Sequence, residues 1–492
     1  MNINQFKNLA SQGYNRIPLV REVLADLETP LSVYLKLAKG PYSYLLESVQ
    51  GGEKWGRYSI IGLPCSTVLK FDGNDFRLEK NREVLEQYES EDPFADIEKF
   101  QQRYKIPELD AMPRFNGGLV GYFAYDTVRY IEHKVANSAP EDTVGTPDII
   151  LMVSEEVIVF DNLRGTISLL VYAKPTDDEA FFKAEARLDA LEQELYKPLD
   201  SSLFRPIPQS TDVNEDSFVS SFGEKEYKDA VEKIKEYIFS GDVFQVVLAQ
   251  RMSIHFDGKA IDVYRALRQL NPSPYMVYMD FNDFHIVSAS PEILARLEEG
   301  KITVRPLAGT RPRGHTEEED LALEKDLLSD EKERAEHLML IDLSRNDAGR
   351  VSKIGSVEVT SKMLVERYSH VMHIASNVES EIAEGKTALD VLKATLPVGT
   401  LSGAPKVRAM EIIDEFEPVK RGVYGGAMGC LSWNGNMDMA IAIRTGVIKD
   451  NMLYVEAGAG IVADSVPDME WKETMSKAAA LFQAAKLVKE GM

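Results

Sequence analysis

The sequence predicts a protein of the α+β class, in which strands and amphipathic helices share extensive hydrophobic cores. Period-two alternation of apolar and polar residues, interrupted by turn residues, is typical of antiparallel strands. Apolar residues at helical spacing mark helices between these runs. At 492 residues and 44% hydrophobic composition, the chain is long enough for two or three core-forming units.

Charge and cysteine content narrow the classes of function. The formal net charge of -23 argues against nucleic-acid and anionic membrane partners. The two cysteines, Cys65 and Cys430, cannot form a disulfide framework, and no Cys/His cluster predicts zinc. We find no signal-like N-terminus and no apolar run near the ~18 residues that span a bilayer. We therefore expect a soluble, cytoplasmic protein.

The first 196 residues are predicted to be mainly strands. Residues 149–160 and 166–172 are expected to form a hairpin across Asn162-Leu163-Arg164-Gly165. Residues 197–216 contain prolines, serines and acidic residues and lack the regular apolar spacing of a helix or strand, so we predict a linker there. It divides an N-terminal region, 1–196, from a C-terminal region, 217–492. Further strands are expected at 58–61 and 66–71, with helices at 3–11, 30–39 and 177–195.

The C-terminal region is predicted to mix helices and strands. Its most informative element is a long acidic helix, 316–347, which places Glu333 and Glu336 one turn apart. The alternative interpretation is a capping box of Asp330 and Glu333, with Glu336 exposed. The helix is expected to bury Ala335, Leu338, Met339 and Asp342. Other helices are expected at 223–240 and 260–270, and strands at 244–254, 275–281, 284–288 and 302–306.

A second carboxylate pair lies near the C-terminus. Glu470, Glu473 and Lys477 fall at i, i+3 and i+7 of a predicted helix, so they share one face. Alone, this pattern favours an ordinary solvated charge face. Beside Glu333 and Glu336, it indicates an oxygen-ligand site for Mg²⁺, although ligand type does not exclude manganese.

Groups for an anionic substrate are predicted nearby. Residues 457–460 are expected to form a glycine-rich loop, whose backbone N–H groups can approach an anion, and Arg444 adds a cation. Glu292 follows a predicted strand and is a candidate general acid, or else a helix-start glutamate. His370 and His373 are one turn apart if that segment is helical, but no third ligand follows to make zinc probable.

Five motifs lie along the C-terminal region: PLAGTRP (306–312), DLSRND (342–347), GTLSGAPK (399–406), YGGA (424–427) and AGAGIVADS (457–465). Together they resemble the motifs of the chorismate-binding enzymes, and within them those of the anthranilate synthase branch. Two departures separate this branch from its neighbours. Ala308 stands where aminodeoxychorismate synthases resemble a lysine-containing motif, and Gln245 stands where isochorismate and salicylate synthases usually have a lysine base.

The resemblance implies a fold, a reaction and partners. The expected fold is a pair of antiparallel sheets packed as a sandwich with helices outside. The expected reaction adds ammonia at C2 of chorismate, loses the C4 hydroxyl to give an aminodeoxyisochorismate, and eliminates pyruvate to give anthranilate, the first committed step of tryptophan biosynthesis. Because the chain lacks a glutaminase signature, a glutamine amidotransferase subunit is implied, with two copies of each subunit. The alternatives are an aminodeoxychorismate or aminodeoxyisochorismate synthase, and a non-catalytic tryptophan sensor.

The resemblance also assigns roles to residues. Glu336 and Glu473 would bind Mg²⁺, with Glu333 and Glu470 in the outer shell. Glu292 would be the acid, while His373 and Thr400 position the ring. Tryptophan would bind between LLES (45–48) and NPSPYM (271–276) and inhibit the enzyme by feedback. The alternative interpretation of these two segments is an ordinary strand and a proline-rich turn. The expected substrate-binding residues are Gly309, Thr310, Tyr424, Arg444, Gly458, Ala459, Gly460 and Lys477, and the expected inhibitor-binding residues are Glu47, Ser48, Pro274, Tyr275 and Met276.

Overall fold

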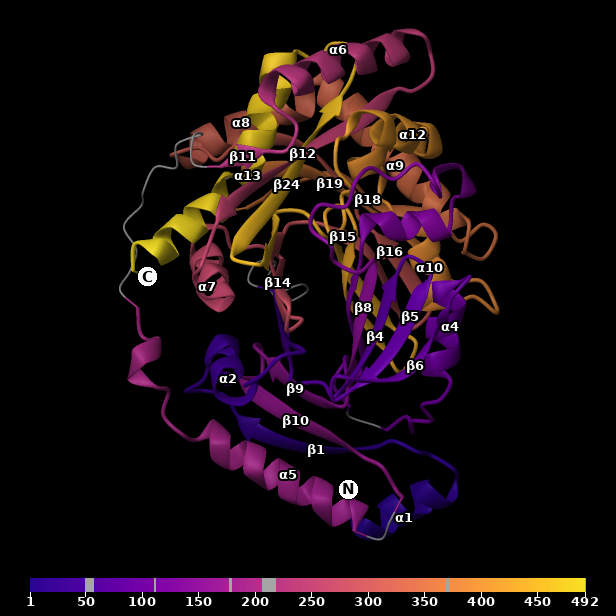
Figure 1. Ribbon diagram of the computed structural model, residues 1–492, viewed down its shortest axis with the longest axis vertical. Coiled ribbons are helices and arrows are strands. Elements are labelled where there is room, and N and C mark those ends of the chain that lie inside the picture. The colour runs from indigo at the N-terminus through magenta and orange to yellow at the C-terminus, as the bar shows by residue number, and fades with distance from the viewer. Residues whose placement is uncertain (49–56, 110–111, 177–178, 206–217, 369–370, 492) are drawn as a thin grey trace.

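The computed structural model describes residues 1–48, 57–109, 112–176, 179–205, 218–368 and 371–491. Figure 1 shows two large sheets with helices around them. Each sheet has twelve strands and every ladder in it is antiparallel. The predicted α+β class is confirmed. In the described part of the chain no helix is long and apolar enough to cross a membrane.

The first sheet combines strands from both ends of the chain. Its order is β1-β10-β9-β3-β2-β13-β14-β23-β24-β12-β11, with β20 paired to β12. The strands β2 and β13 lie side by side, so segments about 230 residues apart meet at its centre. The bounds are β1 Ile17–Leu24, β2 Ser43–Glu47, β3 Tyr58–Gly62, β9 Glu156–Asp161, β10 Thr166–Ala173, β11 Val219–Ser220, β12 Gln245–His255, β13 Tyr275–Asp280, β14 Phe284–Ser290, β20 Gly403–Ala404, β23 Thr445–Lys449 and β24 Met452–Ile461.

The second sheet is built in the same way. Its order is β17-β19-β16-β15-β22-β21-β7-β8-β4-β5-β6, with β18 paired to β19. The bounds are β4 Thr67–Asp72, β5 Asp75–Lys80, β6 Glu83–Glu89, β7 Gly118–Phe123, β8 Ile149–Ser154, β15 Ile293–Glu298, β16 Lys301–Val304, β17 Leu307–Pro312, β18 Glu358–Arg367, β19 Val371–Glu381, β21 Ala427–Ser432 and β22 Met437–Ile441.

A shared core joins the two sheets. Tyr44 and Ile286 of the first sheet and Tyr122, Met152 and Met428 of the second belong to one cluster of buried side chains. Apolar faces that meet in this way are expected of a sheet-on-sheet sandwich. The predicted sandwich is therefore confirmed.

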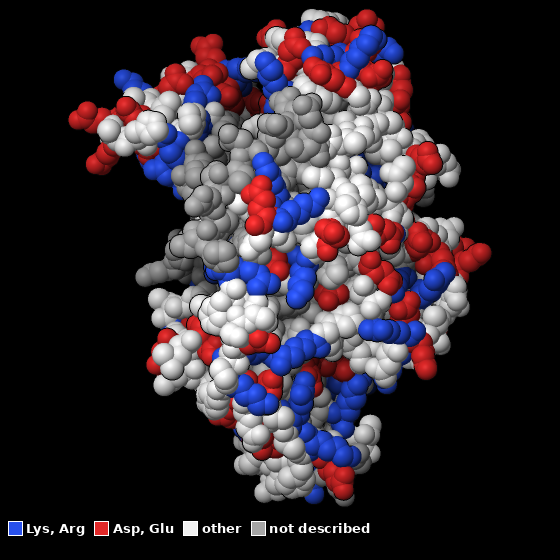
Figure 2. Space-filling view, turned by 60° about the vertical axis from the view of Figure 1, so that its left-hand side comes forward, with Lys and Arg blue, Asp and Glu red and all other residues white. Residues whose placement is uncertain are grey.

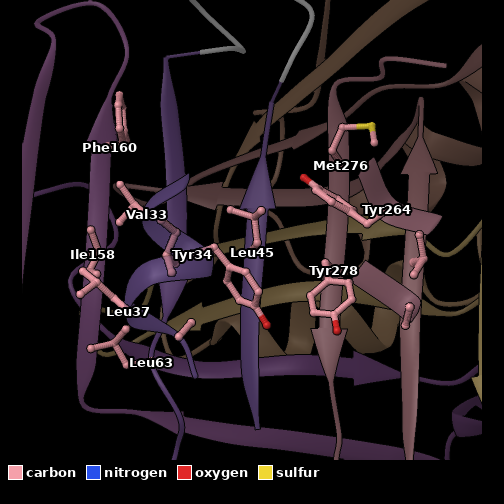
Figure 3. Packing of buried hydrophobic residues seen from close by; sticks show 14 of the residues in the cluster. Val33, Tyr34, Leu37, Leu45, Leu63, Ile158, Phe160, Tyr264, Met276 and Tyr278 are labelled. Atoms are coloured by element: carbon pink, nitrogen blue, oxygen red, sulfur yellow. The ribbon is translucent and has the colours of Figure 1, made fainter. Parts of the chain in front are cut away.

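Helices cover the outer faces. Figure 3 shows one such layer, in which Val33, Tyr34 and Leu37 of α2 pack near Leu45 of β2 and Tyr278 of β13. Another cluster places α4, α9 and α10 on the second sheet. The helices are α1 Ile3–Ser11, α2 Pro30–Leu37, α4 Pro93–Gln101, α5 Ala180–Leu195, α6 Glu224–Phe239, α7 Ala260–Leu270, α8 Glu317–Ser329, α9 Glu331–Gly349, α10 Ala388–Thr395, α11 Gly399–Ser402, α12 Lys406–Phe416 and α13 Pro467–Lys489, with 3₁₀ turns η1 Tyr125–Tyr130, η2 His133–Val135 and η3 Ser201–Leu203.

Three predicted elements differ from the structure. Residues 149–160 form two strands, β8 and β9, which belong to different sheets, and only β9 pairs with β10. The predicted helix 316–347 is two helices, because the Asp330 side chain caps α9 by accepting from the backbone N–H groups of Lys332 and Glu333. The predicted loop 457–460 is part of strand β24.

The buried face of α9 is also displaced from the predicted one. Leu338 and Asp342 are exposed, whereas His337, Leu340 and Ile341 are buried. This helix packs against β17 and β19, and its polar residues are spread around it, so the sequence contains no single apolar stripe.

The described chain surface carries both signs of charge. Figure 2 shows lysine and arginine side chains interspersed with aspartate and glutamate on one face.

Each sheet takes strands from both sides of the predicted linker 197–216, of which residues 206–216 lie outside the described chain. The division into regions 1–196 and 217–492 stays a prediction.

Candidate active site

Glu292 lies between β14 and β15, so it is not a helix-start residue. Its side chain is 5% exposed, and burial raises the pKa of its carboxyl group to about 8. The Thr400 hydroxyl of α11 donates to Glu292 Oε1 at 3.4 Å. A carboxylic acid that stays protonated at neutral pH is suited to general acid catalysis.

His373 lies on β19 and faces β17, which carries Gly309 and Thr310. His373 Nδ1 lies 2.8 Å from the Gly309 carbonyl oxygen and 3.1 Å from Thr310 Oγ1. Burial lowers the pKa of His373 to about 4, so the imidazole is neutral at pH 7. Because Nδ1 must donate to the carbonyl, Nε2 is an acceptor. The segment is a strand rather than the helix considered for His370 and His373, and His370 lies outside the described residues.

Arg444 occupies the turn before β23, with a positive φ of 49°. Burial lowers the pKa of its guanidinium group. Within the described ranges no carboxylate forms an ion pair with it, although its charge acts on His373. A half-buried cation that keeps no anion of its own is prepared for an anionic ligand.

Strand β24 brings its two glycines against neighbouring side chains. A Cβ at Gly458 would lie 2.9 Å from the Tyr424 hydroxyl, and one at Gly460 would lie 2.5 Å from Gln245 Nε2. Gly458, Ala459 and Gly460 pair with Ala249, Leu248 and Val247 of β12. The glycines therefore permit close approach of side chains to the strand, rather than opening a loop.

Lys477 connects this strand to α13. Its ammonium donates to the Gly458 carbonyl at 2.9 Å and lies 2.7 Å from Glu473 Oε1. Its charge also opposes the raised pKa of Glu292 and lowers the pKa of His373. Lys477 therefore contacts the glycine strand and acts electrostatically on both Glu292 and His373.

The two predicted carboxylate pairs approach this cluster from different helices. On α9, Glu333 Oε1 accepts from Arg311 at 3.3 Å, and Glu336 Oε1 accepts from Gln245 Nε2 at 3.0 Å. Burial, and then the charge of Glu336, raise the pKa of Glu333. Burial raises the pKa of Glu470 on α13, and the Glu473 charge adds to this. Each pair is thus a concentration of negative charge.

The two pairs do not close around a common point. Among the residues that the structure describes, no group of three or more His, Cys, Asp and Glu side chains could hold a metal ion. Glu470 instead lies within electrostatic reach of Lys332 on α9. A divalent ion here would need oxygen ligands from substrate and water, as Mg²⁺ commonly does.

Comparison with known proteins identifies the family. The model of the chorismate binding enzymes matches residues 43–483. Anthranilate synthase component 1 of Pseudomonas aeruginosa is 58% identical over 492 residues, covering 100% of both chains. The corresponding protein of Neisseria gonorrhoeae is 56% identical over 491 residues, covering 99% of both.

This chain belongs to the chorismate-binding enzyme family. A solved structure, anthranilate synthase component I from Streptococcus pneumoniae, matches with a TM-score of 0.78 and 38% identity over 93% of this chain and 98% of that one. The menaquinone-specific isochorismate synthase of Escherichia coli, at 19% identity and a TM-score of 0.70 over 98% of each chain, shares the fold.

This chorismate-binding enzyme has a cavity at the β2–β13 junction. Its volume is about 840 Å³, and all five predicted inhibitor-binding residues line it: Glu47, Ser48, Pro274, Tyr275 and Met276. The register pairs Met276 with Glu47. The predicted juxtaposition of the LLES and NPSPYM segments is therefore present in the fold.

The Glu47 carboxylate already has partners on helix α7. Arg268 of α7 donates to it at 3.0 and 3.2 Å, and the Tyr264 hydroxyl donates to Glu47 Oε2. Sequence reasoning missed both partners, although Tyr264 and Arg268 fall one turn apart on the helix that precedes the NPSPYM segment. It also missed Arg311, whose signal is its place two residues after Gly309 in a predicted motif.

Proposed function

We propose that this chain is the chorismate-converting subunit of an anthranilate synthase, which forms anthranilate and pyruvate from chorismate and ammonia. The observation that carries the proposal is the presence, around His373 and Lys477, of a buried acid, Glu292, and of a partly buried Arg444 that no described carboxylate neutralises. An acid and an anion-binding cation are what loss of a hydroxyl from a dicarboxylate requires. Full-length relatives named anthranilate synthase component 1 support the same reaction.

Chorismate would be held by its carboxylates. Arg444 offers a planar fork for the enolpyruvyl carboxylate, and Tyr424 with the Gly458–Gly460 strand would form the adjoining wall. Gly309 and Thr310 would line the opposite side. Lys477 would balance negative charge near the ring carboxylate. His373 Nε2, as an acceptor, and the Thr400 hydroxyl would orient the ring.

The acid step falls to Glu292. Ammonia attacks C2, the two ring double bonds shift, and the C4 hydroxyl leaves as water when the Glu292 carboxyl group donates its proton. The new C2 ammonium then loses a proton, which the Glu292 carboxylate can take back. Glu336 and Glu473 would hold Mg²⁺, and Glu333 and Glu470 would orient its waters. A bound ion would supply Lewis acidity for the ring carboxylate. Elimination of pyruvate from the aminodeoxyisochorismate then leaves the aromatic product.

Ammonia would come from a separate glutamine amidotransferase subunit, in an assembly with two copies of each chain. Burial raises the pKa of the Cys430 thiol to about 12 and also raises that of Cys65, so neither thiol forms a nucleophilic thiolate at neutral pH. These are the two cysteines of the chain. A glutaminase of the cysteine type therefore has no nucleophile here.

Feedback inhibition by L-tryptophan would use the β2–β13 cavity. The ammonium of the ligand would share the Glu47 carboxylate with Arg268, Ser48 would bond its polar end, and Pro274 and Met276 would cover the indole. Inhibition requires only that the less active conformation binds tryptophan better.

Product identification tests the proposal. Purified chain is incubated with chorismate, Mg²⁺ and ammonium at alkaline pH, where free NH₃ is abundant, and the products are separated chromatographically. We expect anthranilate and pyruvate in equal amounts, and no anthranilate when glutamine replaces ammonium. Accumulated aminodeoxychorismate or aminodeoxyisochorismate would assign the chain to those synthases instead. Unchanged chorismate, with tryptophan still bound, would indicate the non-catalytic sensor.

A further inference from the structure

A buried ion pair lies directly behind the wall of the active site. Arg421 and Glu417 are 3% and 5% exposed, and they form a two-point contact: Arg421 Nε donates to Glu417 Oε2 at 2.8 Å, and Nη2 donates to Oε1 at 2.5 Å. Burying two charges is costly unless the remaining donors and acceptors are also satisfied. The partners that satisfy them show what the pair does.

The remaining Arg421 donors bind two backbone segments of the site. Nη1 donates to the Leu401 carbonyl of α11 at 2.6 Å, and Nη2 donates to the Val247 carbonyl of β12 at 2.8 Å. Leu401 follows Thr400, whose hydroxyl donates to Glu292. Val247 lies opposite Gly460. One guanidinium therefore ties the acid's hydroxyl partner to the glycine strand.

Tyr424 is a third element that Arg421 contacts. The guanidinium carbon lies 5.6 Å from the centroid of the Tyr424 ring and 4.6 Å from that of Tyr125. These distances are within the range of cation–π attraction. The Tyr424 hydroxyl in turn meets Gly458. Arg421 thus packs behind the same ring whose hydroxyl lies against the glycine strand.

Further buried groups hold this pair in place. Glu417 Oε1 accepts from the Ala249 backbone N–H at 2.8 Å, opposite Gly458. Arg251, itself paired with Glu456 at 3.0 Å, donates to the Arg421 carbonyl at 3.2 Å. Donors and acceptors with set directions fix a geometry that apolar packing alone leaves adjustable.

We propose that Arg421, locked by Glu417, is a positioning residue for the reaction, which fixes Thr400 against Glu292 and Tyr424 against Gly458 without touching substrate. The proposal rests on the chorismate chemistry given under Proposed function. A displacement of about 1 Å in positioning groups can cost about 10²-fold in rate. The role therefore predicts a kinetic defect larger than any loss of folded protein.

The test compares Arg421→Lys with Arg16→Met in the intact chain, using chorismate, Mg²⁺ and ammonium. Arg421→Lys keeps the charge that Glu417 needs but cannot make the forked contacts. We expect kcat/KM for chorismate to fall about 10- to 100-fold per folded site. Arg16 is the matched control, because it pairs with Glu155 and lies 4.8 Å from the Tyr104 ring but contacts none of these site segments. Arg16→Met should keep kcat/KM within about twofold.

A second background separates positioning from a merely structural role. In the Thr400→Ala/Tyr424→Phe double variant the groups to be positioned have lost their hydroxyls, so adding Arg421→Lys should cost less than about threefold. If Arg421→Lys does not fold, Glu417→Leu/Arg421→Met removes both charges together and takes its place. Thermal unfolding gives the folded fraction in each case.

The outcomes are distinct. Wild-type turnover is measured first, so an inactive wild type counts against the proposed function. With an active wild type, unchanged kcat/KM in Arg421→Lys overturns the positioning role. The same loss in both backgrounds also overturns it, since the effect would not pass through Thr400 and Tyr424. A loss that disappears in the Thr400→Ala/Tyr424→Phe background supports it.

Discussion

The arginines of the β2–β13 cavity and Arg444 of the active site differ in whether a carboxylate pairs with them. In the cavity, Arg57 pairs with Asp161 at 2.8 Å, Arg114 with Glu298 at 2.6 Å and Arg296 with Asp438 at 2.7 Å. In the active site, Arg444 has no carboxylate partner among the described residues. The cavity is therefore suited to a ligand of little net charge, such as a zwitterionic amino acid, and the active site to an anion.

The acidic groups show the same contrast. Glu47 in the cavity is held by Arg268 and Tyr264. Glu292 is buried with a hydroxyl as its side-chain partner, and burial raises its pKa to about 8. Charges that are paired within the protein stabilise the fold, whereas unpaired titratable groups are available for a reaction. Substitutions of the paired and unpaired groups test this difference.

Glu292→Gln should lower kcat about 10²- to 10⁴-fold, because the amide cannot donate the proton that the leaving hydroxyl needs. Wild-type kcat should fall as pH rises through about 8, where Glu292 loses its proton, and this limb should be missing in the variant. The assay is anthranilate formation between pH 6 and 10, with total ammonium adjusted so that the concentration of free NH₃ stays constant. Glu299→Gln, at an exposed turn, is the control. A variant with the wild-type rate would remove Glu292 from the acid role.

The raised pKa of Glu292 also has a consequence for stability, which the same variant reveals. The pKa of Glu292 in the folded protein lies above the ordinary value of 4.5. Its contribution to the free energy of unfolding is therefore complete below pH 4.5 and is lost as pH rises through about 8. The unfolding midpoint of wild type should therefore decrease over that window relative to Glu292→Gln, as measured by thermal scans at constant ionic strength.

Glu336→Gln and Glu473→Gln should each lower Mg²⁺-dependent turnover on the order of 10³-fold, because a metal-bound carboxylate is lost while the fold is kept. Rates are measured across a Mg²⁺ titration, with Glu331→Gln as an exposed control on α9. Near-normal rates of both variants at saturating Mg²⁺ would contradict the assignment of the two pairs.

Arg444→Met should lower kcat/KM for chorismate about 10- to 100-fold, the cost of losing a charge-assisted contact of about 1.5–3 kcal/mol. Its unfolding temperature should be equal to or above that of wild type, because the variant no longer buries an unpaired cation. Arg16→Met should do the reverse, losing stability but not affinity, since it leaves Glu155 without its arginine. Strong destabilisation of Arg444→Met would show that the Arg444 guanidinium is paired with a carboxylate in the folded protein.

Helices and strands with a clear periodicity of apolar residues are predicted correctly from the sequence. Elements whose placement depends on tertiary contacts are not. α1 and α7 lie at the predicted residues, since each has an unambiguous apolar face. Residues 149–160 have no turn signal, because β8 is buried on both faces and the chain passes into the other sheet near Glu155. Alternation along one strand carries no information about which sheet it joins.

The candidate site shows a similar limit. Residues 457–460 were predicted as a loop because glycine weakens strands. The strand survives because it pairs with β12, and its glycines are needed where Tyr424 and Gln245 approach. Pairings such as Gln245 with Glu336, or Arg268 with Glu47, join residues about 90 and 220 positions apart, which no local pattern encodes.

Ser48→Phe tests the cavity with the smallest change to catalysis. The larger side chain should fill space between β2 and Pro274, so tryptophan binds less well while the active site is untouched. A coupling free energy of about 1–3 kcal/mol would link tryptophan binding to inhibition, so a variant that loses it should need about 5- to 150-fold more tryptophan for half inhibition.

Anthranilate formation is followed across a tryptophan titration at fixed chorismate, with Ser201→Phe on the exposed η3 turn as the control. Uninhibited turnover should stay within about twofold of wild type, because surface and loop substitutions away from the reacting groups rarely cost more. Equal tryptophan sensitivity in Ser48→Phe and wild type, or inhibition that Mg²⁺ relieves by competition, would place the regulatory site elsewhere and end the contrast between a balanced cavity and an unbalanced active site.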